Sequence, residues 1–194
     1  MEREVIWVAW EGPGLEHLRL ALREEGPVAE GLVIGLEENS PFRVSYEIHC
    51  DARWRVRELR VGIPTSDRPS IDLLADGEGR WKTRSGHAVP ELEGCVDVDI
   101  SATPFTNTLP IRRLGLEPGE SAELRVAYVD VPELAVGPAR QRYECLEERA
   151  DGGLYRFETP PIETLPSGFT AQIPVDVDGL VIDYPGLFRR AWSG

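Results

Sequence analysis

The sequence contains few of the residues that staple small proteins together or hold metal ions. Its 194 residues include three cysteines and three histidines, together with one methionine and one lysine, Lys82. Cys50, Cys95 and Cys145 lie far apart and form no Cys-x-x-Cys pair, so the sequence indicates neither a zinc ribbon nor a disulfide framework. We therefore expect neither a metal ion nor an organic cofactor.

Long hydrophobic runs are also absent. No stretch approaches the ~18 consecutive apolar residues that a transmembrane helix requires. The opening sequence, MEREVIWVAW, lacks the basic region and the sustained apolar stretch that are typical of a signal peptide. We expect a cytoplasmic protein.

Positive charge is scarce as well. The formal net charge is −13 at pH 7, whereas a nucleic-acid partner requires a basic surface that displaces counterions from phosphates. The same charge disfavours electrostatic attachment to anionic membrane surfaces. The sequence thus predicts no nucleic-acid partner and no transmembrane segment, and it leaves the oligomeric state open.

The sequence is rich instead in apolar residues that alternate with polar ones, as is typical of half-buried strands. One such face carries Phe42, Val44, Tyr46, Ile48 and Cys50, and the alternation recurs in residues 122–128 and 169–175. The segment Val5–Trp10 is apolar on both faces, as expected of a fully covered strand. Between Trp54 and Val61 the apolar phase slips by one residue, which predicts a β-bulge.

Turn residues divide these strands into hairpins. Asp76–Gly79, Asp151–Gly153 and Asp178–Gly179 each separate two runs of strand-like sequence. The segment Leu15–Arg23 also suits a helix face, but its leucines alternate from Leu18 onward, and we predict a strand there. About ten or more strands without alternating helices indicate one all-β domain over residues 1–194, built as an antiparallel sandwich, a barrel or a strongly curved sheet.

One polar segment, Gly94–Leu114 (GCVDVDISATPFTNTLPIRRL), interrupts this pattern. Asp97 and Asp99 share one face of a strand, where side chains two residues apart stand about 6.5–7 Å from each other. Their repulsion must be relieved by solvent, by a cation or by protonation of one carboxyl. Arg112 and Arg113 are the nearest basic residues in the sequence. We therefore expect the functional surface to centre on this segment.

The part of the segment after the strand is dense in hydroxyl and amide groups. Pro104 and Pro110 stiffen it and bias the preceding residues, Thr103 and Leu109, toward extended geometry. We predict a rigid loop whose uncharged donors and acceptors suit a sugar or another polyhydroxylated head group. These groups belong to Thr103, Thr106, Asn107 and Thr108.

Three other interpretations of the segment stay open. Its Ser, Thr and Asn side chains could cap turns through local backbone hydrogen bonds, which is a purely structural role. Asp97 and Asp99 could serve a hydrolase that acts on a polar small molecule, although carboxylates side by side on one strand do not flank a scissile bond. A metal site would add His49 or Asp51, but no spacing matches a known ligand set. We favour a binding protein over an enzyme.

The segment resembles the signature block of a bacterial family described as putative glycolipid-binding. The matching residues are Gly94–Ile100 and Thr103–Leu114. Similar motifs occur in the hairpin Asp76-Gly77-x-Gly79-x-Trp81, in Gln141-Arg142-Tyr143 and in Gly179–Arg190. The resemblance covers nearly the whole chain, with a looser match over the first 40 residues.

This resemblance implies a fold like that of the bacterial lipoprotein-localisation factors, in which a strongly curved antiparallel sheet with few short helices forms a half-open barrel around acyl chains. It also implies a protein that binds a glycolipid-like amphiphile without catalysis and holds its apolar part in the concave face. The residues that we then expect to contact the ligand are Asp97, Asp99, Thr103, Thr106, Asn107, Thr108, Arg112, Arg113, Gln141 and Tyr143.

Overall fold

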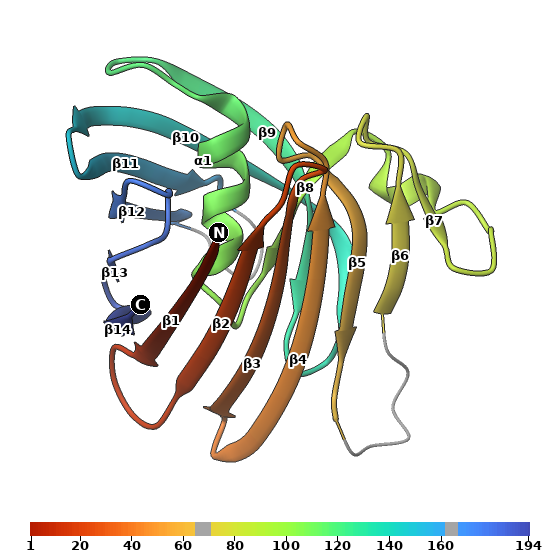
Figure 1. Ribbon diagram of the computed structural model, residues 1–194. Coiled ribbons are helices and arrows are strands. Elements are labelled where there is room, and N and C mark those ends of the chain that lie inside the picture. The colour runs from red at the N-terminus through yellow and green to blue at the C-terminus, as the bar shows by residue number, and fades with distance from the viewer. Residues whose placement is uncertain (65–70, 162–166) are drawn as a thin grey trace.

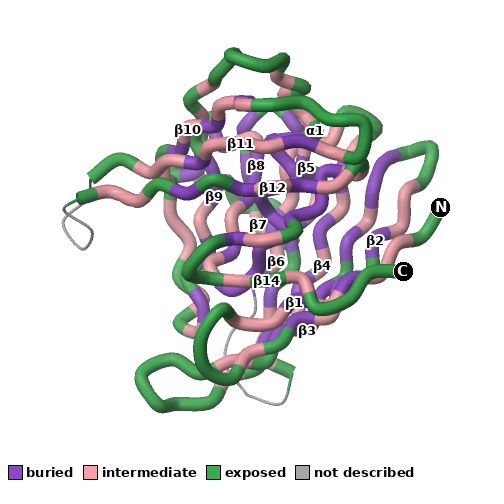
Figure 2. The backbone as a smooth tube through the Cα atoms, turned by 90° about the vertical axis from the view of Figure 1, so that its left-hand side faces the viewer, coloured by how far each residue is buried: buried purple, intermediate pink, exposed green. Residues whose placement is uncertain are grey.

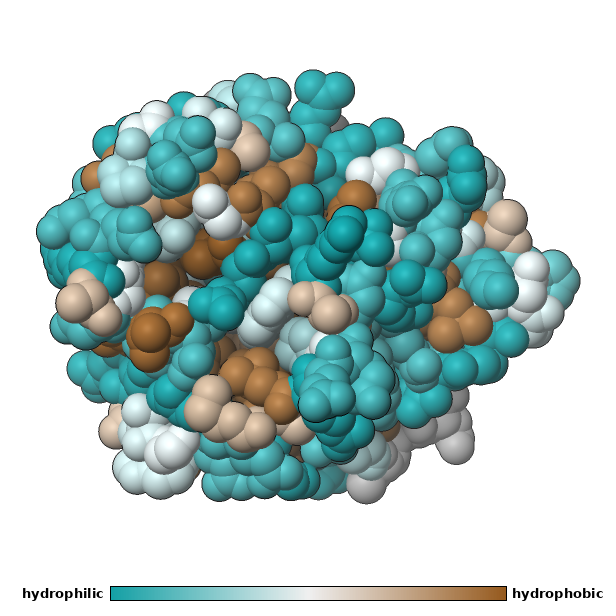
Figure 3. All heavy atoms as spheres, turned by 45° about the horizontal axis from the view of Figure 1, so that its top comes forward, coloured by the Kyte–Doolittle hydropathy of each residue, from teal (hydrophilic) through white to brown (hydrophobic). Residues whose placement is uncertain are grey.

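The computed structural model describes residues 1–64, 71–161 and 167–194, and in this part of the chain two β-sheets enclose a single α-helix (Figure 1). The strands dominate, as the sequence predicts. Hydrophilic residues form most of the surface that Figure 3 shows, in keeping with the high content of charged residues. No helix among the described residues is long and apolar enough to cross a bilayer.

The larger sheet has nine strands in the order β13-β14-β1-β2-β3-β4-β5-β6-β7. These strands are β1 (Glu2–Ala9), β2 (Leu15–Leu22), β3 (Pro27–Glu37), β4 (Ser40–Cys50), β5 (Val56–Gly62), β6 (Ile71–Ala75), β7 (Trp81–Thr83), β13 (Asp183–Tyr184) and β14 (Phe188–Ser193). All neighbouring pairs in it are antiparallel. The sheet curves strongly, and the two sheets together form no closed barrel (Figure 1).

The smaller sheet has five strands in the order β12-β11-β10-β9-β8. They are β8 (Cys95–Ile100), β9 (Ser121–Asp130), β10 (Ala135–Arg149), β11 (Gly152–Thr159) and β12 (Phe169–Asp176). Strands β8 and β9 run parallel, which departs from the antiparallel pairing that the sequence predicts. A parallel pair needs a crossover connection, and here the crossover contains the 3-10 helix η2 (Phe105–Asn107) and the helix α1 (Thr108–Leu114).

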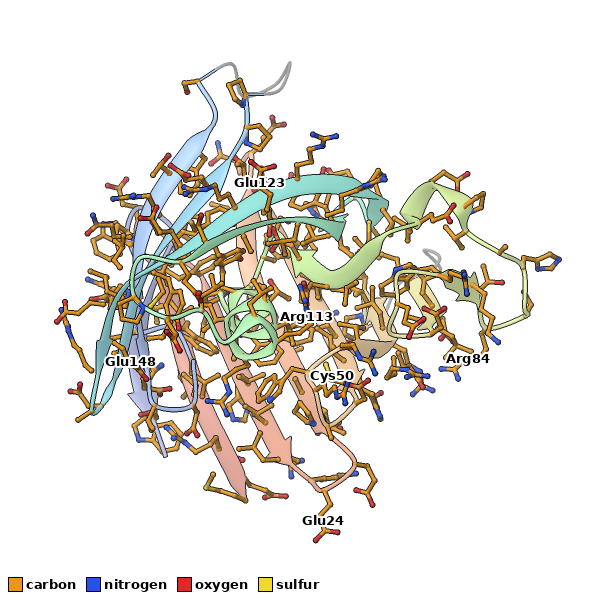
Figure 4. The ribbon with its side chains drawn as sticks, turned by 90° about the horizontal axis from the view of Figure 1, so that it is seen from above. Glu24, Cys50, Arg84, Arg113, Glu123 and Glu148 are labelled. Carbon is orange, nitrogen blue, oxygen red and sulfur yellow. The ribbon has the colours of Figure 1, made fainter. Side chains whose placement is uncertain are left out.

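The core fills the space between the sheets. Seen from above, α1 lies between the two layers (Figure 4). Buried residues, drawn in purple, recur along strands of both sheets (Figure 2). Trp7 and Leu18 of the larger sheet, Ile100 of the smaller sheet, and Phe105 and Leu109 of the crossover belong to one cluster of buried residues. Period-two alternation in the strands therefore produces the expected result, with one face of each sheet turned inward.

Several local predictions are confirmed. Residues Leu15–Leu22 form a strand, and the hairpin β6–β7 closes at Asp76–Gly79. The hairpin β10–β11 closes at Ala150 and Asp151, at the start of the predicted turn. The pairing of β4 with β5 shifts register next to Cys50, at the predicted bulge. The few helices are short, as expected; the third, η1, spans Pro90–Leu92.

The rigid loop expected after Ile100 is instead helical from Phe105 to Leu114. Pro110 does not prevent this, because it lies in the first turn of α1, where backbone N–H groups have no partner within the helix. The helix ends where Gly115 adopts a left-handed conformation with φ 56°, a geometry that glycine adopts without steric cost. The prediction of an extended Leu109 is therefore wrong.

Candidate functional site

Most polar residues of the Gly94–Leu114 segment are buried or partly buried, and they tie the crossover to both sheets. Asp97 is completely buried, and Arg113 of α1 folds back onto it. The Arg113 Nε donates to Asp97 Oδ1 at 2.9 Å, and its Nη2 donates to Oδ2 at 2.5 Å. The Arg113 side chain extends from α1 into the space between the sheets (Figure 4). Burial raises the pKa of Asp97, and the Arg113 guanidinium opposes that rise.

Asp99 is bound by two uncharged groups. Thr106 Oγ1 donates to its Oδ1 at 3.0 Å, and Gln141 Nε2 donates to its Oδ2 at 2.6 Å. Burial raises the pKa of this carboxyl as well. Asp97 and Asp99 thus do not share a partner: an arginine holds the first, and a hydroxyl and an amide hold the second.

The other five predicted residues also bond within the protein. The Tyr143 hydroxyl donates to Asn107 Oδ1 at 2.8 Å, and Thr108 Oγ1 donates to the Gly179 carbonyl at 2.8 Å. Arg112 stays apart from the carboxylates: its guanidinium lies 5.3 Å from the centre of the Trp54 ring and donates to the Val177 carbonyl. Thr103 Oγ1 donates to Glu16 at 2.7 Å. The ten predicted residues therefore form several small clusters, in which Arg112 is exposed and the others are buried or partly buried. Their contact with a ligand stays a prediction.

A pocket of about 510 Å³ opens between the two sheets, beside the β1–β2 and β3–β4 hairpins. We call it the inter-sheet pocket and define it by six of its lining residues: Trp7, Glu16, Phe42, Ala102, Tyr128 and Leu187. These residues come from the larger sheet, from the crossover after β8, from β9 and from the turn before β14. Another depression, of about 550 Å³, is lined by residues of the smaller sheet and of the segment that follows β11, with none from the larger sheet.

Glu16 is the unusual group in this pocket. It lies on β2 in phase with Leu18 and Leu20, so its side chain joins the apolar inner face, and it is only 1% exposed. The Tyr46 hydroxyl and Thr103 Oγ1 both donate to Oε1, at 2.5 and 2.7 Å. The other oxygen, Oε2, is buried without a hydrogen-bond partner.

The environment of Glu16 makes its carboxyl titrate near neutrality. Burial raises its pKa to about 7, against the lowering effect of the hydrogen bonds from Tyr46 and Thr103. A buried ionisable group with a shifted pKa in a pocket is a functional-site candidate. In the sequence, Glu16 stands two residues before Leu18, at the same spacing that separates Leu18, Leu20 and Leu22, so the alternation places this glutamate on the inward face. The alternation identifies the strand, but it does not show that Glu16 reaches a pocket, because the pocket depends on contacts with residues far along the chain, such as Thr103.

The residues considered for a metal site are bound elsewhere. His49 Nε2 lies 2.5 Å from Glu47 Oε1, and Asp51 accepts hydrogen bonds from Arg55. Within the described ranges, no group of three His, Cys, Asp or Glu side chains is arranged to hold a metal ion.

Comparison with known proteins identifies the family. Residues 4–190 match the model of the family described as putative glycolipid-binding, and the chain belongs to that family. The chain is also similar to a DUF1089 family protein from Pseudomonas aeruginosa, whose crystal structure was determined at 1.80 Å. The two are 41% identical over 93% of this chain and 95% of the other, with a TM-score of 0.77. No curated protein matches the sequence.

Proposed function

We propose that this member of the family binds a glycolipid-like amphiphile in the inter-sheet pocket. One observation carries the proposal: Glu16, whose carboxyl has a buried oxygen without a hydrogen-bond partner, lines the pocket together with aromatic and aliphatic side chains. Ligand pockets are commonly clefts of about 300–1,000 Å³ that combine an apolar lining with a few polar groups. The pocket has this size and this composition.

Apolar side chains exposed at the pocket support an amphiphile rather than a free sugar. Leu15, Ile34, Leu36 and Leu187 all line it, with exposed fractions between 41% and 53%. An alkyl chain that covers them removes apolar surface from water, which stabilises a complex by about 25 cal/mol per Å² before the costs of association. A ligand with both an alkyl chain and a polar group matches the lining as a whole.

The Gly94–Leu114 segment has a different role in this proposal from the one that the sequence predicts. Its side chains hydrogen-bond to both sheets, as Arg113 does to β8 and Thr103 does to β2. We infer that these bonds hold the sheets at the separation that keeps the pocket open. Thr103 also positions the Glu16 carboxyl directly, so it links the predicted segment to the pocket.

The alternative of a hydrolase that uses Asp97 and Asp99 stays a prediction. A general acid or base must reach a proton on the substrate. Arg113 engages both oxygens of Asp97, and Thr106 and Gln141 engage those of Asp99. This geometry favours binding over catalysis.

The cytoplasm remains the compartment that we expect. Cys50, Cys95 and Cys145 are all buried free thiols, which is usual where the surroundings keep thiols reduced. Fractionation of cells that express the full chain tests this expectation.

Ligand binding can be tested on the purified chain with a panel of glycolipids and alkyl glycosides, read by native mass spectrometry and by thermal shift. Ala9 lines the pocket next to Trp7 in β1. The substitution Ala9→Trp places a large ring at this point, so we expect it to abolish binding. Ala150 is exposed in the β10–β11 turn, and Ala150→Trp is the matched control that should bind as the wild type does.

Two results would contradict the proposal. One is that no member of the panel binds the wild-type chain below millimolar concentration. The other is that Ala9→Trp, with a melting temperature equal to that of Ala150→Trp, still binds the amphiphile with unchanged affinity.

A further inference from the structure

We infer that the inter-sheet pocket selects a head group that carries no negative charge and donates a hydrogen bond, through a hydroxyl or amino group, to Glu16 Oε2. This inference deepens the proposed function and rests on it. It concerns which amphiphiles the pocket accepts, rather than whether it accepts one.

The charges around the pocket all have one sign. Its lining includes four acidic residues, Glu11, Glu16, Glu37 and Asp130, and no Lys, Arg or His among the described lining residues. A phosphate, sulfate or carboxylate in this space would meet like charges and no compensating cation. Like-charge contacts of this kind suppress wrong partners.

The geometry of Glu16 specifies the complementary group. Oε1 already accepts two hydrogen bonds, so the carboxyl is held in place and Oε2 has the remaining capacity. Each oxygen of an ionised carboxyl accepts hydrogen bonds, and a protonated carboxyl can also donate one. A hydroxyl serves either state because it both donates and accepts. A phosphate oxygen without a proton cannot donate to Oε2.

The surroundings of Oε2 strengthen this preference. Trp7 and Val33 are the register neighbours of Glu16 on β1 and β3, and both are buried and apolar. In a site of low polarity, a polar group without a hydrogen-bond partner has a higher free-energy cost than in water. Repulsion between like charges is also stronger there. A ligand group that donates to Oε2 therefore supplies the hydrogen bond that this oxygen lacks in the folded protein.

Two probes with the same alkyl chain separate the effect of the head group from that of the tail. Octyl glucoside and octyl phosphate, both kept below their micelle-forming concentrations, are titrated calorimetrically into the full chain at about pH 8, where the Glu16 carboxyl is mostly ionised. We expect the glucoside to bind at least roughly tenfold more tightly than the phosphate. Glu16→Gln removes the charge with little change of shape and should reduce that ratio by at least about threefold.

Glu123→Gln is the matched control. Glu123 is an exposed residue of β9 that lies apart from α1 in Figure 4, and it does not line the inter-sheet pocket. Its substitution should leave the affinity ratio of the two probes unchanged. Thermal melts of both variants confirm that they are folded before the affinities are compared.

The outcomes distinguish this inference from the proposed function. Equal or tighter binding of octyl phosphate, abolished by Ala9→Trp, overturns the inference on head groups and leaves the proposed function standing. A ratio that Glu16→Gln and Glu123→Gln change equally also overturns the assignment to Glu16. Failure of both probes to bind overturns the inference, and the proposed function falls with it when no other member of the glycolipid panel binds either.

Discussion

Glu16 carries an oxygen that the fold buries and leaves without a partner. Such an atom costs about 1–3 kcal/mol of folding free energy, because water no longer hydrogen-bonds to it. Buried polar groups are nearly always paired, and an exception calls for a functional or structural reason. A ligand donor supplies that reason here, and the burial of Glu16 leads directly to a test by pH.

Glu16→Gln should gain stability relative to the wild type as the pH rises. In the folded chain the pKa of Glu16 is raised to about 7, whereas the ordinary pKa of a glutamate carboxyl is 4.5. Below about pH 4.5 the Glu16 carboxyl is protonated in both the folded and the unfolded chain, so it does not lower the unfolding free energy of the wild type. Between the two values it loses stability, by about 3 kcal/mol in all, and above pH 7 the loss is constant. Urea unfolding of both chains at several pH values measures the difference.

Glu123→Gln serves as the control for this titration, because the same substitution on an exposed side chain should produce no such trend. If the difference in unfolding free energy between the wild type and Glu16→Gln stays flat from acid to alkaline pH, Glu16 does not titrate as a buried carboxyl.

Asp97→Asn should destabilise the protein by about 3 kcal/mol, because it leaves the guanidinium of Arg113 partly buried without its counter-charge. Asp72→Asn is the matched control. Asp72 also pairs with an arginine, Arg84, but both side chains are well exposed, so its loss should cost less than about 1 kcal/mol. Equal losses in urea unfolding would show that burial does not strengthen the Asp97–Arg113 pair.

At the scale of the elements, α1 is the part of the fold that the sequence predicts least well. Pro104 and Pro110 indicate a stiff loop by local rules, yet Pro110 is compatible with the first turn of a helix. The seven residues of α1 are too few to show helical periodicity. Packing of Leu109 between the sheets stabilises the helix, and that contact is not visible in a linear sequence.

Gly115→Ala should destabilise the protein by about 1 kcal/mol, because Gly115 ends α1 in a left-handed conformation. No atom lies within 4 Å of the added Cβ, so the cost is conformational rather than steric. Gly137 in β10 also has open space around a Cβ, without a positive φ. Gly137→Ala should therefore stabilise the protein by about 0.4–1 kcal/mol, because alanine restricts the unfolded chain more than glycine does. If Gly115→Ala does not lower the unfolding free energy relative to Gly137→Ala, this account of the helix end is wrong.

The strands are predicted far better than the helix, and the reason is physical. In a strand, the alternation of apolar and polar residues indicates which face is buried, as it does in β2 and β4. Pairing partners are set by the whole fold. The pairing of Arg113 with Asp97 can be suggested from the sequence, because both residues lie in the Gly94–Leu114 segment. The contact between Glu16 and Thr103 joins residues far apart in the chain, and local patterns do not reveal it.

At the scale of the whole molecule, two sheets of unequal width enclose one short crossover. The crossover fills part of the space between them, and the remainder is open beside the hairpins of the larger sheet as the inter-sheet pocket. The sequence predicts a concave apolar face that holds the ligand, with the head group on the Gly94–Leu114 segment. In the structure that segment occupies the interior, and the proposed binding site lies next to it.

The measurement that tests the central claim most directly is photo-crosslinking with an alkyl glucoside that carries a diazirine in its chain, followed by mapping of the labelled residues by mass spectrometry. We expect the label on residues that line the inter-sheet pocket, such as Phe42, Tyr128 and Leu187. Competition by unlabelled octyl glucoside should remove it. Competable labelling confined to the depression of the smaller sheet, around Arg125 and Arg140, would contradict the account.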